Sequence, residues 1–373
     1  MRTTALFLAL SLLGVCLASG MTGCGGGSGA PPPTASKNLF AGSYDVAAVW
    51  GMQIPAPSRV AGMWGTAVAD GVQSVSVDIA SNELGVIDPA YLTGTIDYSI
   101  GLDRTLGWRS TGGPFLDVWS GGISADGHVA AVASVQPSQP TVFLLTRRVG
   151  SWSDASLEGD YHLCGFSFNY VLALHTGWMG TITFDGTGGA SVSVGANYDG
   201  TIAPFGPSPV SYAVAANGVV TLDFGGSITV QGSITGGGDV VIASGSTTSD
   251  GPAAIYALVR ASAATSAATF SGEYHVAGFA KDILTNEHRC MTGWMRPDGA
   301  TDVSWITSNV VERDAGVRGG GVGTFTVVGN GSLLISTQLT DNLRGAVSPT
   351  GDFAVLGRIS DPGSDPTFLF LYR

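Results

Sequence analysis

The chain has 373 residues, of which 44% are hydrophobic, only 12% are charged and 56 are glycine. This composition is too apolar for a disordered protein and too rich in glycine for a mainly helical one. The formal net charge of −12 disfavours nucleic acid and anionic membrane surfaces as partners.

The first 24 residues have the pattern of an export signal. Arg2 supplies a positive charge, and residues 5–18 form an apolar run as long as a signal-peptide core but short for a membrane span. After this run come Thr22, Gly23 and Cys24, and then a stretch rich in glycine and proline. The pattern resembles the lipobox of bacterial lipoproteins, in which the cysteine becomes lipidated and N-terminal.

The resemblance implies a signal peptide over 1–23, a lipid on Cys24 and a tether over 24–37. By the same resemblance, Gly25 after the cysteine implies an anchor in the outer membrane, facing the periplasm or the outside. Met21 departs from the leucine usual in this family, so ordinary cleavage after residues 18–20, which would give a soluble secreted protein, is the alternative. We favour the lipobox because an anchored domain needs a flexible tether, and several acyl chains, at about 0.8 kcal/mol per CH₂, make release negligible.

Three copies of one unit follow the tether, over 38–148, 157–260 and 270–373. Each copy begins with an apolar residue followed by Gly-x-Tyr and ends with an apolar strand that finishes in arginine. The period of 113 residues is the size of a domain and is too long for a solenoid or propeller repeat. Positions that match between the copies are the terminal arginines Arg147, Arg260 and Arg373, the aromatic residues Tyr98, Tyr212 and Phe325, and the tryptophans Trp64, Trp178 and Trp294.

The second copy shows the strand pattern most clearly. Turn signals such as Asp185-Gly186 and Asn217-Gly218 separate short apolar runs, as in β-hairpins. A meander of eight antiparallel strands most simply closes into a barrel, which removes exposed edges, and a two-sheet β-sandwich is the alternative. The sequence therefore predicts an all-β protein of three tandem eight-stranded barrels. In copy two the expected strands are 160–168, 176–184, 190–194, 210–215, 219–224, 228–234, 239–243 and 253–260.

The opening Gly-x-Tyr and the final arginine of each unit resemble the calycin superfamily of lipocalins, fatty-acid-binding proteins and avidins. In that superfamily an aromatic residue of the first strand packs under a basic residue of the last strand and closes one end of the barrel. The resemblance implies three barrel-closing pairs, which are Tyr44 with Arg147, Tyr161 with Arg260, and Tyr274 with Arg373.

Several other residues are candidates for binding. We expect Trp64, Trp178 and Trp294 to line the barrel interiors, either as a stacking platform for a ligand or as core residues. Copy two is rich in small residues over 186–196 and is the copy in which we expect an open cavity. Two histidines that follow the Gly-x-Tyr tyrosine, His162 and His275, are expected on the barrel surface. The cysteines outside the signal, Cys164 and Cys290, are expected to be buried free thiols, and a disulfide between the two copies is the alternative.

The motifs of common catalytic and metal sites are not found in the sequence. It holds no Gly-x-Ser-x-Gly elbow, no His-Glu-x-x-His pair and no phosphate-binding loop. We therefore expect no enzyme activity, no metal and no cofactor. The leading hypothesis is a lipid-anchored envelope protein that binds a small apolar ligand or an envelope protein. A structural or surface-display scaffold with filled barrels is the alternative.

Overall fold

A computed structural model of the chain shows an all-β protein. It describes residues 37–52, 59–83, 86–110, 118–134, 140–169, 174–198, 201–225, 228–246, 253–282, 287–312, 315–337, 342–358 and 365–373. The predicted signal peptide, the lipid acceptor Cys24 and the tether up to residue 36 lie outside these residues. The described barrels belong to one compact unit.

The strands form three closed antiparallel barrels of eight strands each. Barrel 1 consists of β1 (Ala41–Met52), β2 (Arg59–Asp70), β3 (Ser74–Glu83), β4 (Val86–Ile100), β5 (Thr105–Ser110), β6 (Val118–Ile123), β7 (Val129–Ser134) and β8 (Thr141–Arg147). Barrel 2 consists of β9 (Glu158–Asn169), β10 (Leu174–Asp185), β11 (Gly189–Tyr198), β12 (Thr201–Val214), β13 (Val219–Asp223), β14 (Thr229–Thr235), β15 (Val240–Ser246) and β16 (Ala253–Arg260). Barrel 3 consists of β17 (Tyr274–Asp282), β18 (Glu287–Pro297), β19 (Asp302–Glu312), β20 (Ala315–Val327), β21 (Ser332–Thr337), β22 (Asn342–Val347), β23 (Phe353–Gly357) and β24 (Thr367–Tyr372).

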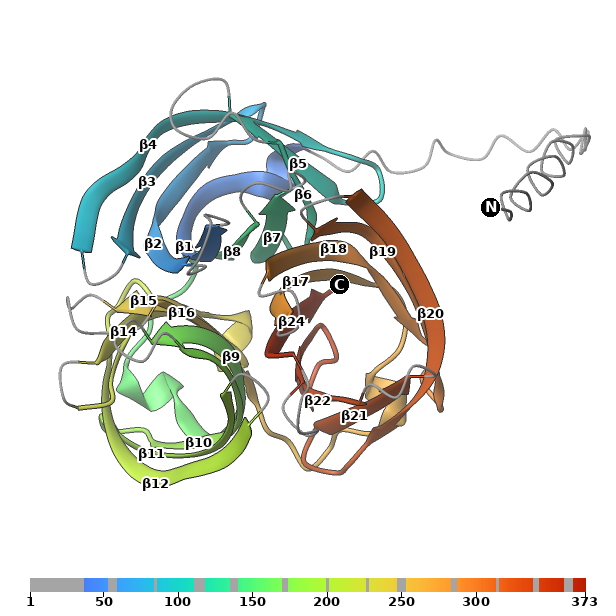
Figure 1. The fold of residues 1–373 in the computed structure, drawn as a ribbon. Coiled ribbons are helices and arrows are strands. Elements are labelled where there is room, and N and C mark those ends of the chain that lie inside the picture. The colour runs from blue at the N-terminus through green and yellow to red at the C-terminus, as the bar shows by residue number, and fades with distance from the viewer. Residues whose placement is uncertain are drawn as a thin grey trace, which may run out of the picture. The chain divides into compact units, whose positions relative to one another are not determined.

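The predicted barrel topology is confirmed, and the sandwich alternative is wrong. In each copy the first strand pairs with both the second and the last, so β1 pairs with β8, β9 with β16 and β17 with β24. Figure 1 shows the green-to-yellow strands of barrel 2 end-on as a closed ring. All eight strands expected in copy two are present. Short 3₁₀ turns, η1 (Lys37–Phe40), η2 (Asp154–Ser156) and η4 (Ala267–Thr269), precede the three barrels.

The last strand of each barrel, called here the closing strand, is buried on both faces. The closing strands β8, β16 and β24 have an almost unbroken run of buried residues instead of the alternation of a strand with one wet face. One face of each lines its own barrel. Because the other face is apolar too, it requires cover from outside the barrel.

The neighbouring barrels provide this cover, and the result is a single hydrophobic cluster that we call the shared core. The rings of Phe166 in barrel 2 and Phe279 in barrel 3 meet edge to face, with centroids 5.0 Å apart. The three copies, which the sequence presents as separate units in series, are therefore packed on one another. The shared core includes Val49, Val142 and Leu144 of barrel 1, Phe166, Ile255 and Val259 of barrel 2, and Phe279, Val355 and Phe370 of barrel 3.

Small residues let the barrels approach closely at the seams around the shared core. Gly62 of barrel 1 lies against barrel 2, where an added Cβ would be 2.9 Å from the Cα of Gly245. Beside it, the Ser244 hydroxyl accepts a hydrogen bond from the backbone N–H of Ala48 at 3.1 Å. Between barrels 3 and 1, the Tyr372 hydroxyl lies 3.1 Å from the carbonyl oxygen of Ala131. Apolar burial and a few hydrogen bonds between side-chain hydroxyls and backbone groups therefore join the barrels.

The seam between barrels 3 and 1 makes folding stability depend on pH. His275 is only 2% exposed, and burial, helped by the nearby Arg104 and opposed by Asp103, lowers its pKa to about 4. A histidine in the unfolded chain has a pKa near 6.5. Between about pH 6.5 and 4 this histidine is therefore protonated in the unfolded chain and neutral in the folded one. The free energy of unfolding is unaffected by His275 above this pH range and decreases as the pH falls through it.

We expect urea unfolding of the wild type to lose up to about 3 kcal/mol from His275 alone between pH 6.5 and 4. A His275→Gln variant should show a correspondingly flatter dependence of the unfolding free energy on pH. Equal slopes for the variant and the wild type would contradict this placement of His275.

Candidate functional site

The interior of barrel 1 is filled by aromatic side chains. Trp108 and Trp119 are each only 1% exposed, and both pack on Phe143, with ring centroids 6.0 and 5.9 Å away. Further along the barrel, Trp50 packs on Tyr91 at 5.7 Å. This copy matches the filled interior of the scaffold hypothesis.

Barrel 2 differs, because it holds an apolar cavity of about 100 Å³ that we call the mouth cavity. Trp178 and Tyr256 both lie beside Gly165, four residues along β9 from Tyr161 and toward the other end of the barrel. Phe205 at the rim is 43% exposed, so the cavity reaches the surface. The expectation that copy two has an open cavity is confirmed. Its lining residues are Leu163, Trp178, Val192, Val194, Phe205, Phe224, Ile228 and Tyr256.

The mouth cavity is uncharged and has one polar anchor. The indole N–H of Trp178 donates to the Ser167 hydroxyl at 2.7 Å, which fixes the ring at the cavity wall. Phe205 meets this ring edge to face at 5.9 Å. Burial raises the pKa of the Tyr256 phenol, so it stays neutral. Gly165 leaves room for the Tyr256 ring, because a Cβ there would lie 2.3 Å from it.

Only one of the three predicted interior tryptophans lines a barrel interior. Trp64 pairs with Ala47, three positions from the inward Tyr44, and Trp294 pairs with His275, the neighbour of the inward Tyr274. Successive strand residues point to opposite faces, so both rings lie on the outer walls. The expectation that Trp64 and Trp294 line an interior is therefore wrong, and only Trp178 does so.

The two histidines that follow the tyrosines point out of their barrels but are not on the surface. His162 is 7% exposed and its Nε2 lies 2.9 Å from the carbonyl oxygen of Asn330 in barrel 3. His275 is buried in the seam with barrel 1, where a Cβ on Gly122 would lie 2.4 Å from its imidazole. The expectation of surface histidines is wrong because each barrel covers the outer wall of the next.

Two further predictions concern sulfur and metal. Cys164 and Cys290 are both buried thiols, as expected, and burial raises the pKa of Cys164. His175 of barrel 2 and His288 of barrel 3 meet with their Nε2 atoms 2.9 Å apart. Across the described ranges, no group of three or more His, Cys, Asp or Glu side chains has the geometry of a metal site. In the same ranges no helix has the length and apolar character of a membrane span.

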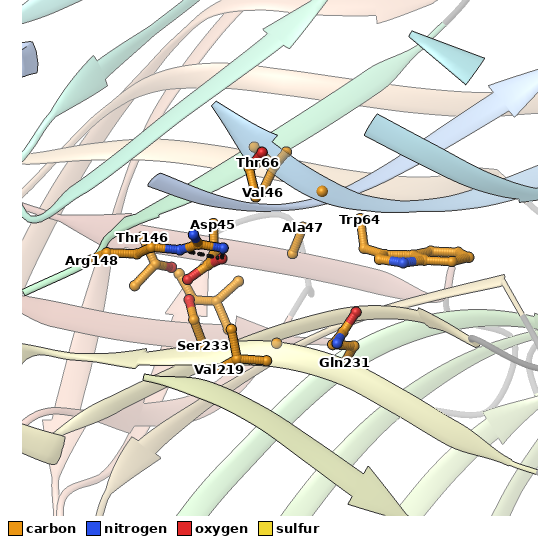
Figure 2. A pocket seen from close by; sticks show the side chains of 13 residues that line it. Asp45, Val46, Ala47, Trp64, Thr66, Thr146, Arg148, Val219, Gln231 and Ser233 are labelled. Atoms are coloured by element: carbon orange, nitrogen blue, oxygen red, sulfur yellow. Dashed lines mark hydrogen bonds and ion pairs between the residues drawn. The ribbon is translucent and has the colours of Figure 1, made fainter. Parts of the chain in front are cut away.

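A second hollow, which we call the seam pocket, lies between barrels 1 and 2 and has a volume of about 110 Å³ (Figure 2). Its most polar group is an ion pair, in which Asp45 Oδ1 accepts from Arg148 Nη2 at 2.6 Å and from Nε at 2.9 Å. Burial raises the pKa of Asp45, and the hydrogen bond from Arg148 opposes this. The polar and aromatic lining also includes Trp64, Thr66 and Thr146 of barrel 1 and Gln231 and Ser233 of barrel 2.

The six residues named as barrel-closing pairs meet at one end of each barrel. The guanidinium carbon of Arg260 lies 4.9 Å from the ring centroid of Tyr161, and that of Arg373 lies 5.9 Å from the ring of Tyr274. In barrel 1, Tyr44 and Arg147 occupy directly paired positions on β1 and β8. These tyrosine rings are 0% exposed.

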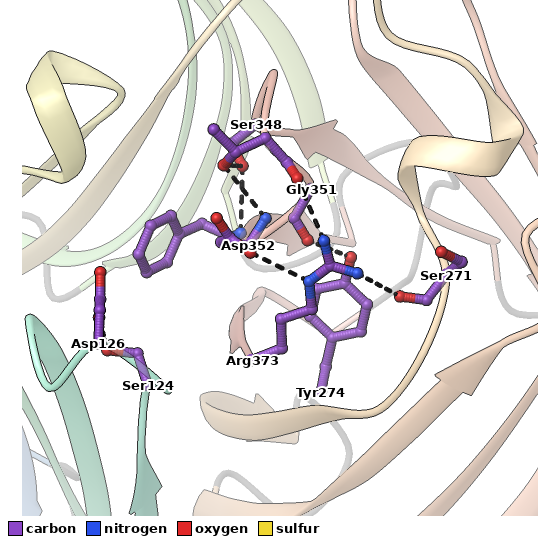
Figure 3. Close-up of polar contacts among 10 residues, drawn as sticks. Ser124, Asp126, Ser271, Tyr274, Ser348, Gly351, Asp352 and Arg373 are labelled. Atoms are coloured by element: carbon purple, nitrogen blue, oxygen red, sulfur yellow. Dashed lines mark hydrogen bonds and ion pairs between the residues drawn. The ribbon is translucent and has the colours of Figure 1, made fainter.

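The closed ends repeat one hydrogen-bonding plan. Each tyrosine hydroxyl donates to the carbonyl of a turn glycine, Tyr44 to Gly127 at 3.0 Å and Tyr161 to Gly238 at 2.6 Å. The glycine of each Gly-x-Tyr has a positive φ, between 91° and 110°, which explains glycine at this place. Figure 3 shows the third copy, where Arg373 lies against Tyr274. There the guanidinium donates to the Ser271 carbonyl at 2.8 Å and to Asp352 at 3.1 Å.

Replacing the closing tyrosine with Phe keeps the ring and removes its hydroxyl. Tyr161→Phe should lower the free energy of unfolding by about 0.5–1.5 kcal/mol, because a buried hydrogen bond is lost. Tyr44→Phe and Tyr274→Phe should cost about as much, since they remove the same bond. Urea denaturation measures all three. Tyr198→Phe, at a half-buried tyrosine of the same barrel, is the control and should change stability by less than about 0.5 kcal/mol. Three unchanged closing variants would contradict the role of these pairs.

Comparison with known proteins yields distant structural likenesses only. Transferrin-binding protein B from Haemophilus parasuis Hp5 is 8% identical, with 89% of this chain and 75% of that chain covered and a TM-score of 0.27. The isotype 1 protein of that name from serogroup B Neisseria meningitidis is 7% identical, with 89% and 76% covered and a TM-score of 0.29. No family model and no curated protein matches the chain. At these TM-scores the likenesses carry no inference, so function has to be argued from the residues of this chain.

Proposed function

We propose that the protein is a lipid-anchored binding protein of the bacterial envelope that holds a small apolar group in the mouth of barrel 2. The observation that carries the proposal is the mouth cavity, whose eight lining residues are all apolar or aromatic and include no charged side chain. Concave apolar sites with a few fixed polar groups are typical of small-molecule binding.

The size of the mouth cavity limits the ligand to about one ring or the end of an acyl chain. A closed cavity of about 150 Å³ lined by Leu, Ile and Phe accepts benzene. The mouth cavity measures about 100 Å³ and opens beside the exposed Phe205, so part of a ligand can remain outside. The hydrogen bond of Trp178 to Ser167 keeps the indole in place as one wall.

The envelope location belongs to the same proposal. It depends on the lipobox-like pattern that ends at Cys24 and on the Gly/Pro-rich tether after it. Acylation at Cys24 would hold the barrels at the outer membrane, where apolar compounds partition.

A scaffold role is the second candidate, and the filled interior of barrel 1 favours it for that copy. Trp108, Trp119 and Phe143 are buried and pack together in the interior of that barrel. In this view barrel 1 has a structural role, and barrel 2 provides the binding site in its mouth cavity.

Toluene is a suitable probe, because it presents one apolar ring. We expect it to bind the wild-type chain saturably and to raise the free energy of unfolding by about 1.4 kcal/mol at ten times its Kd. Ile228→Trp places a large ring at the cavity wall and should abolish both effects. Ligand-observed NMR gives the Kd, and urea denaturation with and without toluene gives the stabilisation.

Ile202→Trp is the matched control, because Ile202 is 38% exposed in β12 and does not line the cavity. This variant should bind toluene as the wild type does. Binding that survives Ile228→Trp, or no saturable binding by the wild type, would rule out the mouth cavity as the site and leave the scaffold role.

A further inference from the structure

Aromatic rings form much of the wall of the mouth cavity. Half of its lining residues are aromatic, and they are Trp178, Phe205, Phe224 and Tyr256. The rings of Trp178 and Phe205 stand at 79° to one another, so they form two sides of a corner. The rings of Phe224 and Tyr256 are inclined at 36°, with centroids 6.5 Å apart. The four rings therefore line the cavity in different orientations and do not lie in one stack.

Three of these rings distinguish barrel 2 from the other copies. The strand register places Trp178, Phe205 and Phe224 at positions where neither of the other barrels has an aromatic residue. The corresponding residues are Met63, Leu92 and Ser110 in barrel 1 and Met291, Gly319 and Thr337 in barrel 3. The common fold does not need aromatic side chains at these positions, so we look for their role in the cavity.

Barrel 2 is also acidic. Between residues 157 and 260 the sequence has seven aspartates and glutamates, and apart from histidine its one basic residue is Arg260. Arg260 packs over Tyr161 at the closed end of the barrel. On the side of the mouth, Asp223 is exposed and directly precedes Phe224. The electrostatic field of this barrel therefore attracts cations and repels anions.

An aromatic wall inside an acidic barrel suits a cation without hydrogen-bond donors. Ring faces attract cations, most strongly where water is excluded. The cavity lining has no charged side chain, and the indole N–H of Trp178 is already bonded to Ser167. A primary ammonium would lose its hydrogen bonds to water here without replacement. A quaternary ammonium has none to lose, and its methyl groups present an apolar surface.

The size of the cavity fits the same group. A trimethylammonium group has fewer heavy atoms than benzene, which a closed cavity of about 150 Å³ accepts. The mouth cavity of about 100 Å³ can therefore hold the group, while the rest of the ligand stays outside beside the exposed Phe205.

We infer that the mouth cavity binds the trimethylammonium group of a choline-type ligand. The inference rests on the function proposed above, because it names the chemical class of the group held at that site. The N-methyl groups contact the aromatic rings, and the acidic barrel favours the positive charge. The recognised group is the same in free choline and in the headgroup of a phosphocholine lipid.

Saturation-transfer difference NMR on the full mature chain tests the inference with choline and with 3,3-dimethylbutan-1-ol, an uncharged molecule of the same shape. We expect choline to bind about fivefold more tightly than this analogue, because only choline gains the attraction of the rings for a cation. Choline should also compete with toluene. Glycerophosphocholine is the third probe. If it binds as tightly as choline, the source is a lipid headgroup, and if it binds more weakly, the source is free choline.

Variants of the exposed rim residue Phe205 locate the site. Phe205→Leu keeps an apolar side chain and removes the ring, so it should weaken choline binding about tenfold and still bind toluene. Phe205→Tyr keeps the ring and is the matched control, which should bind choline as the wild type does. Circular dichroism and thermal unfolding establish that both variants are folded.

The toluene measurement separates the inference from the proposed function. Three results would overturn the inference alone: toluene binding without choline binding, equal affinities for choline and its uncharged analogue, or wild-type choline affinity in Phe205→Leu. Absence of binding by both toluene and choline would overturn the inference and the proposed function together.

Discussion

The apolar outer face of the closing strands is the constraint on which the rest of the structure depends. A barrel covers only the inner face of its own strands. The apolar outer faces of β8, β16 and β24 would therefore be exposed to water unless another barrel covered them. Packing the three copies on one another satisfies all three strands at once. The resulting shared core draws residues from every barrel and fixes which walls meet at the seams.

Once the seams are fixed, small sequence differences between copies decide what each space becomes. The position after the Gly-x-Tyr tyrosine holds histidine in two copies and aspartate in the first, and the aspartate lines a pocket at its seam. The interiors diverge in the same way. Barrel 1 is filled by tryptophan and phenylalanine rings, while barrel 2 keeps a cavity at the end away from its closing pair. The mouth cavity is apolar and the seam pocket is polar, so hollows in one repeated frame differ in their chemistry.

The architecture could be predicted because its signals are local and repeated. Asn-Gly and Asp-Gly turns mark the hairpins, and the eight strands of copy two follow from them. The Gly-x-Tyr and the final arginine mark the two ends of each copy, and they recur at the same places in all three. The repeat extends to the backbone conformation of one turn. Arg104 adopts a positive φ at the position that Gly218 and Gly331 occupy in the other copies.

The placement of the tryptophans was not predictable from the period of the repeat. The residues opposite the closing tyrosines are Ala67, Ile182 and Met295, and the tryptophans lie three, four and one residues before them. An odd offset puts the side chain on the outer wall and an even one puts it inside, so a slip of one residue reverses the face. The burial of His162 and His275 was missed because it depends on contact between barrels. The unbroken apolar closing strands were the one available signal of that contact.

Native-state hydrogen exchange of the full chain at increasing denaturant tests the central claim that one shared core joins the barrels. Amides of β8, β16 and β24 should open with the same free energy, equal to that of global unfolding, because none of the three strands can lose its cover alone. If one closing strand opened several kcal/mol below the other two, the barrels would be independent units, and the account of the shared core would be wrong.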